Sequence, residues 1–80
     1  MSAETASNTK RVYVRLLGEG TNVYRPTIAV IEEKDVARLM APDHYDADDE
    51  EWEFKPGALV LLESRILEGR EELVAVSLIK

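Results

Sequence analysis

Alternating hydrophobic and polar residues predict a β-strand near the start of the chain. Over residues 10–17, three aliphatic side chains fall on one face, and the residues between them fall on the other: Val12, Val14 and Leu16 against Arg11, Tyr13 and Arg15. Because successive side chains of a strand point to opposite sides, this period of two indicates a half-buried strand. The glycine-containing residues 18–22 predict a turn after it.

The next two segments are also typical of strands. Residues 23–31 are rich in β-branched side chains, and Pro26, which has no N–H to donate, predicts an edge position or a bulge. Residues 36–40 fit a helix of about two turns as well as a strand, since Val36, Leu39 and Met40 have helical spacing. We favour the strand, because its neighbours are strands and so short a helix would be hard to nucleate.

The second half continues the pattern after a loop over residues 41–51 that we expect to be too charged to pack. Pro56 and Gly57 suit the centre of a type II turn. Residues 59–62 are apolar on both faces, which is typical of a strand covered on both sides. Residues 68–71 predict a hairpin turn into a last strand over 73–79.

Five short strands in one small domain favour an all-β, SH3-like barrel over residues 10–80, preceded by a disordered tail over residues 1–9. Two alternatives stay open. One is an OB-like barrel, and the other is an α+β fold with one short helix near residues 33–40.

Length and composition exclude several kinds of chemistry. The chain has 80 residues and no cysteine, so disulfides, thiolate zinc sites and thiol nucleophiles are ruled out. A domain this small has little room for a catalytic cleft beside its core, so we expect no enzyme activity and no cofactor. No apolar run approaches the roughly 20 residues that span a bilayer, and residues 1–9 lack the features of a signal peptide. We therefore expect a cytoplasmic protein without membrane contact.

The formal charge of −6 is unevenly distributed along the chain. Residues 1–40 carry six Lys and Arg against five Asp and Glu, whereas residues 41–80 carry four against eleven. Seven of those carboxylates lie between Asp43 and Glu53. The acidity is thus local, and a basic face remains possible on the first two strands.

The acidic stretch does not fit a defined metal site. A calcium-binding EF-hand loop that starts at Asp46 would need glycine at position 51 and glutamate at position 57, where the chain has Glu51 and Gly57. We interpret the stretch as a solvated loop and predict no metal ligands in it. His44, the one histidine, is expected to be an exposed surface residue, because nothing nearby would make it a general base.

Three non-catalytic functions follow as hypotheses. The first is a protein or peptide partner, basic or proline-containing, that docks at the acidic loop and its flanking aromatic residues: Tyr45, Asp46, Asp48, Asp49, Glu50, Glu51 and Trp52. The competing interpretation is that Trp52 packs at the barrel seam. The second is nucleic-acid binding through a basic, aromatic face: Arg11, Tyr13, Arg15 and Arg25. The third is weak homodimer formation through an exposed edge, either the strand with Pro26 or the last strand.

Two motifs carry a resemblance that covers most of residues 11–76. They are Glu19-Gly20-Thr21 followed by Val23-Tyr24-Arg25-Pro26, and Trp52-Glu53-Phe54 followed by Pro56-Gly57, with Leu73-Val74-Ala75 closing the pattern. With them the chain resembles a family of small uncharacterised bacterial proteins that have an EGTxV(W/Y)RP segment and a WEFxPG turn. The resemblance implies a small β-barrel and supplies no active site. Lys55 departs from the pattern, which has a proline there.

Overall fold

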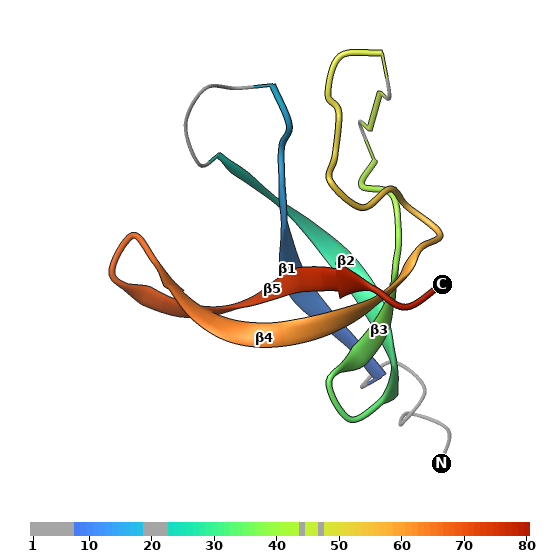
Figure 1. The fold of residues 1–80 in the computed structure, drawn as a ribbon, viewed down its shortest axis with the longest axis vertical. Coiled ribbons are helices and arrows are strands. Elements are labelled where there is room, and N and C mark those ends of the chain that lie inside the picture. The colour runs from blue at the N-terminus through green and yellow to red at the C-terminus, as the bar shows by residue number, and fades with distance from the viewer. Residues whose placement is uncertain (1–7, 19–22, 44, 47) are drawn as a thin grey trace.

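The computed structural model describes residues 8–18, 23–43, 45–46 and 48–80, and it is built from β-strands (Figure 1). The five strands are β1 (Thr9–Arg15), β2 (Tyr24–Glu33), β3 (Val36–Leu39), β4 (Leu59–Leu67) and β5 (Arg70–Leu78). The prediction of an all-β fold is confirmed. The alternative of a helix near residues 33–40 is wrong, because Val36–Leu39 pairs as a strand with both β2 and β4. Within the described ranges, no helix is long and apolar enough to cross a membrane.

The strands form a closed barrel in consecutive order, β1-β2-β3-β4-β5. Sequential neighbours are antiparallel, so the first and fifth strands run in the same direction. The barrel therefore closes through a short parallel contact, in which Tyr13 of β1 lies beside Val74 of β5. This order lacks the Greek-key crossover of an OB-like barrel.

One face of each strand supplies the core. The predicted inward positions of β1, Val12 and Val14, are fully buried, and Leu16 follows them just beyond the strand. Ala29, Ala37, Leu39, Val60, Leu62 and Ala75 complete the cluster from the other four strands. Trp52, which lies in none of the strands, is the largest fully buried side chain among the described residues.

Pro26 is accommodated by the hydrogen-bond pattern of the β1–β2 ladder. The N–H of Leu16 donates to the carbonyl of Val23 at 2.8 Å. In an antiparallel ladder such bonded pairs alternate with non-bonded ones, so Tyr13 and Pro26 form a non-bonded pair. The proline nitrogen therefore points away from β1, toward the opposite side of β2. On that side β3 pairs with β2 from Ala29 onward and does not reach Pro26.

The prediction that residues 59–62 are covered on both sides is wrong. Val60 and Leu62 face the core, but Leu61 points outward and is 38% exposed. The barrel is a single closed layer, so no described part of the chain forms a second layer above the outer face of β4. An apolar run of the kind expected for a strand covered on both faces thus occurs here on a strand with only one covered face.

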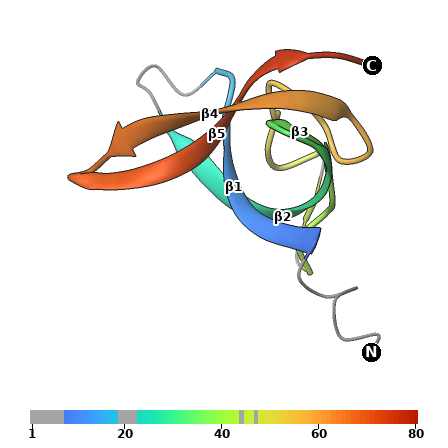
Figure 2. The ribbon, with the colours of Figure 1, turned by 90° about the horizontal axis from the view of Figure 1, so that it is seen from below.

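The β4–β5 hairpin continues well past the barrel (Figure 2). Its outer part, residues 63–72, is called the arm below. Both faces of β4 become exposed after Leu62, and Ile66 is 68% exposed. The strands are joined by Glu68 and Gly69, which both have positive φ, 51° and 82°. Two such residues make the type I′ turn whose twist matches that of the strands, as expected for a tight hairpin.

Candidate functional site

The acidic loop that the sequence singled out is anchored to the barrel by Trp52. This side chain is 1% exposed, and its backbone lies beside Leu16 in an isolated β-bridge. Two hydrogen bonds flank the bridge, from the N–H of Leu17 to the carbonyl of Glu51 and from the N–H of Glu53 to the carbonyl of Arg15, at 2.7 and 2.9 Å. Residues 51–53 thus extend the sheet next to the end of β1.

Tyr45 and Glu50 also attach the loop to the barrel. The ring of Tyr45 meets that of Trp52 edge to face, with centroids 5.0 Å apart and an interplanar angle of 73°. The indole Nε1–H of Trp52 donates to Oε1 of Glu50 at 3.1 Å. Glu50 also forms an ion pair with Arg25 of β2. The Trp52 hydrogen bond, with the Arg25 guanidinium, holds the pKa of Glu50 below its ordinary value.

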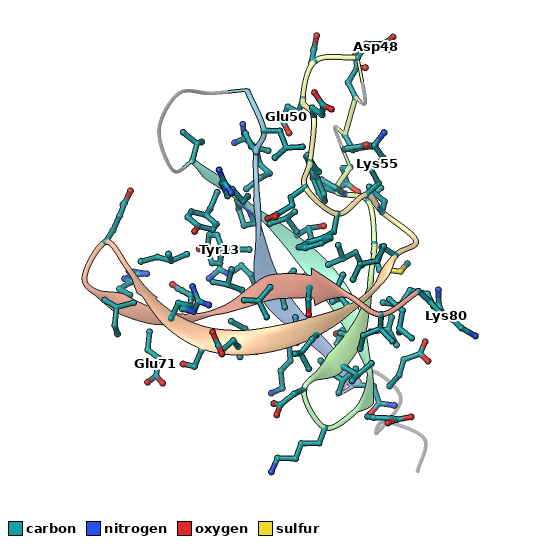
Figure 3. The ribbon with its side chains drawn as sticks, in the orientation of Figure 1. Tyr13, Asp48, Glu50, Lys55, Glu71 and Lys80 are labelled. Atoms are coloured by element: carbon teal, nitrogen blue, oxygen red, sulfur yellow. The ribbon has the colours of Figure 1, made fainter. Side chains whose placement is uncertain are left out.

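The expectation that residues 41–51 are too charged to pack is therefore wrong for part of the loop. Tyr45 packs against the core cluster, where its ring contacts that of Trp52. Glu50 is half-buried because it pairs with the cation of Arg25 on the barrel. The remaining carboxylates of the predicted partner site are exposed: Asp46, Asp48, Asp49 and Glu51. Figure 3 shows Asp48 at the outer end of this loop and Glu50 nearer the barrel.

Two consequences follow for the predicted site at the loop. Trp52 cannot offer its ring to a partner, because the ring is inside the barrel. The described residues contain no group of three or more His, Asp and Glu side chains that could hold a metal ion. Asp46 instead caps its own loop, accepting a hydrogen bond from the N–H of Asp48 at 2.9 Å. His44 lies outside the described residues, as do residues 19–22 of the turn predicted over residues 18–22, whose first residue, Gly18, has a positive φ of 77°.

The structure divides the predicted basic face into two. Arg11, Tyr13 and Arg15 lie on the outer face of β1. Arg25 is paired with Val14, whose side chain is buried, so Arg25 lies on the opposite face and reaches Glu50 at the end of the barrel. The separation follows from the ladder register, in which paired residues of two strands share one face.

Tyr24 takes the place of Arg25 on the outer face. It is paired with Arg15, and Pro26 is paired with Tyr13. Glu53 lies beside Arg15 on the side of β1 that faces away from β2. A row of side chains on the outside of the barrel therefore runs from Tyr24 through Arg15 to Glu53. The outer face thus carries two tyrosines, a proline and both signs of charge.

The arm turns this face into a groove. A cavity of about 850 Å³ lies between the arm and the β1–β2 strands; it is called the tyrosine groove below. Its lining residues are Tyr13, Val23, Tyr24, Arg65, Ile66, Leu67, Glu68, Arg70 and Glu72. Figure 3 shows Tyr13 in the space between β1 and the arm. The pairings of Arg65 with Glu72 and of Leu67 with Arg70 place these four residues on one face of the arm.

The tyrosine groove is electrically balanced. Two arginines and two glutamates line it, and one of the arginines, Arg65, is held in an ion pair with Glu63. Arg70 forms no ion pair with any described residue. The groove thus combines two tyrosine rings and the aliphatic side chains of Val23, Ile66 and Leu67 with four charged groups that can orient a ligand.

The contribution of the arm to this site was missed from the sequence. Arg65, Leu67 and Arg70 are far from Tyr13 and Tyr24 along the chain, and only the closure of β5 onto β1 brings them near. One signal was present in the sequence. The continuous apolar run ends at Leu62, although the chain does not turn until Glu68. A strand that continues without core-facing residues indicates a hairpin that projects beyond its core.

Comparison with known proteins assigns no family to this chain. No family model, no curated protein and no solved structure matches it. The resemblance carried by the EGTxV(W/Y)RP and WEFxPG segments therefore stays a prediction.

Proposed function

We propose that this chain is a non-catalytic binding module that holds an extended, proline-containing peptide of a partner protein in the tyrosine groove. The observation that carries the proposal is the position of Tyr13 and Tyr24 on one outer face, opposite the aliphatic and charged side chains of the arm. Proline-rich segments are already extended in solution and dock in grooves lined by aromatic rings, so they lose little conformational entropy on binding.

The charges around the groove support a peptide over a polyanion. Arginine and glutamate are equally represented in the lining, and Glu53 stands beside Arg15 at the edge of the same face. The chain as a whole carries a formal charge of −6. Nucleic-acid binding depends on a clear excess of cations facing the phosphates, and the groove has none.

The acidic loop has a secondary role in this proposal. Its aromatic residues are used to attach it to the barrel, whereas its exposed carboxylates lie next to the outer face of β1 through Glu51 and Glu53. A basic residue in the partner peptide would be attracted to that side of the groove. The partner site expected from the sequence thus moves from the loop to the tyrosines.

The test is an NMR titration of the isotope-labelled chain with a proline-rich peptide that ends in arginine. A glycine–serine peptide of equal length and charge is the control ligand. We expect chemical-shift changes at Tyr13, Tyr24 and Leu67 with the first peptide only. Changes centred on Asp46–Glu51 would contradict the proposal, as would tighter binding of a single-stranded oligonucleotide at low salt.

Variants separate the groove from the rest of the surface. Tyr24→Ala removes a ring that lines the groove, and we expect it to weaken peptide binding by roughly tenfold or more, as for a buried aromatic anchor. Ile28→Ala is the matched control, because Ile28 is exposed on the outer face of the same strand but does not line the groove. Equal losses in the two variants would refute a specific role of Tyr24.

A further inference from the structure

The outer edge of β4 in the arm has no partner strand within the described part of the chain. β3 pairs with β4 only from Leu59 to Leu61, and one more hydrogen bond, from the N–H of Leu62 to the carbonyl of Asp35 at 2.7 Å, ends the contact. Beyond Leu62, the backbone of β4 pairs, among the described residues, only with β5. Such an edge presents unpaired N–H and C=O groups that can pair with another chain.

Backbone alternation identifies the residues that present those groups. The N–H of Leu62 points toward β3, and the direction reverses at every residue of an antiparallel ladder. The irregularity at Leu61/Leu62 lies in β5, where Val76 has no partner, so the alternation along β4 is unbroken. The N–H and C=O groups of Ser64 and Ile66 therefore point toward the open edge.

The side chains at this edge do little to prevent pairing. β4 contains no proline and no lysine after Leu62, and its one cation there, Arg65, is already paired with Glu63. Ile66 is the most exposed large hydrophobic side chain among the described residues, at 68%. Natural edge strands are more often blocked by charges, prolines or bulges, so this edge is unusually open.

We propose that two copies of this chain pair through their β4 edges, antiparallel and centred on Ile66. In a dimer with a twofold axis, the residue at the axis lies opposite the same residue of the second copy. Every other pair of residues occurs twice, once on each side of the axis. With the axis at Ile66, the two isoleucines face each other. Arg65 then lies opposite Leu67 of the second copy, and Ser64 lies opposite Glu68 of the second copy.

The neighbouring registers are less favourable for reasons visible in the structure. An axis at Arg65 places two arginines directly opposite each other, and like charges in that position destabilise a ladder. An axis at Ser64 places Ile66 of the second copy opposite Leu62, whose N–H is already bonded to Asp35. The Ile66 register avoids both problems, because its paired segment, residues 64–68, ends before the contact with β3.

The dimer would also organise the tyrosine grooves. In this arrangement the twofold axis runs perpendicular to the sheet, so equivalent faces of the two arms lie on the same side. Arg65, Leu67 and Arg70 of both copies would then form one continuous surface over four strands, in the order β5-β4-β4-β5. Pairing uses the backbone edge of β4, whereas the groove is formed by side chains, among them that of Ile66.

Sedimentation velocity over a wide range of concentrations tests the proposal first. We expect the wild-type chain to shift from one to two chains per particle as concentration rises. We expect Ile66→Lys to stay monomeric, since it places a charge at the axis. The matched control is Leu78→Lys, which changes another exposed side chain, 59% exposed, outside the arm edge and should dimerise as the wild type does. A wild type that stays monomeric throughout, or an Ile66→Lys variant that still dimerises, would overturn the proposal.

Disulfide trapping then tests the register, because the chain has no cysteine of its own. In the proposed dimer, the two Cα atoms at position 66 form a hydrogen-bonded pair about 5.5 Å apart, within the range that a disulfide spans. Two Cα atoms at position 64 would be roughly 14 Å apart, four residues along the ladder. We expect Ile66→Cys to cross-link rapidly on mild oxidation and Ser64→Cys to cross-link only slowly. Faster cross-linking of Ser64→Cys would refute the Ile66 register. Far-UV circular dichroism confirms that each variant is folded.

Discussion

Replacing Trp52 by alanine should remove a large part of the stability of this protein, although Trp52 belongs to no strand. The side chain is 1% exposed, and a buried tryptophan truncated to alanine costs about 3–5 kcal/mol. A chain of 80 residues is expected to have a free energy of unfolding of about 4–12 kcal/mol in total. The variant should therefore lose roughly a quarter of its stability or more, and it would be largely unfolded if the wild type lies at the lower end of this range and the loss at its upper end.

The loss has two separable parts. Trp52→Phe keeps a ring in the core but loses the Nε1–H bond to Glu50, and it should cost about 1–3 kcal/mol. Tyr45→Phe is the control, because it keeps the edge-to-face contact with Trp52 and should change stability by less than about 0.5 kcal/mol.

Urea unfolding followed by far-UV circular dichroism measures all three variants, since tryptophan fluorescence is lost with the one tryptophan. The wild type and Tyr45→Phe should unfold at closely similar urea concentrations, with Trp52→Phe lower and Trp52→Ala lowest. If Trp52→Ala unfolds at the same midpoint and with the same slope as the wild type, the residue does not belong to the core. The anchoring of the acidic loop described above would then be wrong.

Three further predictions concern the loop and the arm. The pKa of Glu50 is lowered in the folded state, so the ionised form stabilises the fold at pH values above the ordinary value of 4.5, and this contribution is lost as the pH falls through the folded-state pKa. Glu50→Gln should therefore flatten the acid side of a plot of unfolding midpoint against pH. An unchanged acid side would contradict this role. A double-mutant cycle with Arg25→Ala and Glu50→Gln should give a coupling of about 0.2–1 kcal/mol, because the pair is partly exposed, and additive effects would mean that the ion pair contributes nothing. Glu68→Asn should raise the melting temperature by a few degrees, because asparagine tolerates the positive φ of 51° at this turn position better than glutamate does. Gly69→Ala should lower the melting temperature. Thermal melts measure both variants, and the reverse order of melting temperatures would exclude a type I′ turn.

The proposed peptide site and the proposed dimer make separate demands on the arm. Peptide binding uses the face with Arg65, Leu67 and Arg70, whereas pairing uses the backbone edge at Ser64 and Ile66. Because Ile66 also lines the tyrosine groove, the peptide titration is made with the wild-type chain, below and above the concentration at which it dimerises. A wild type that dimerises but binds no peptide would support the dimer and contradict the peptide site, and a wild type that stays monomeric but binds peptide would do the reverse.

Local patterns were sufficient to predict most of the strands. The alternation of Val12 and Val14 with Arg11, Tyr13 and Arg15 predicted the inward face of β1, and the turn residues Glu68 and Gly69 marked the β4–β5 hairpin. Both signals depend only on neighbours in the sequence, because strand periodicity and turn geometry are set by the local backbone. For the same reason the ambiguous segment at residues 36–40 could be assigned to a strand from its surroundings.

Three features depended on contacts between distant segments. Whether Leu61 is covered depends on how many layers the fold has, and whether Trp52 is core or surface depends on where residues 51–53 meet β1. The side of the sheet that Arg25 occupies could have been inferred from its parity with Thr27 and Ala29, but its pairing with Glu50 could not.

The sequence by itself determined an all-β chain, the strand boundaries to within a few residues, and the concentration of acidic residues between Asp43 and Glu53. Only the tertiary structure decided which aromatic residues are available to a ligand. It buried Trp52 and placed Tyr13 and Tyr24 beside the arm, because barrel closure joins β1 to β5 and carries residues 65–72 to a surface that no sequence spacing connects with them.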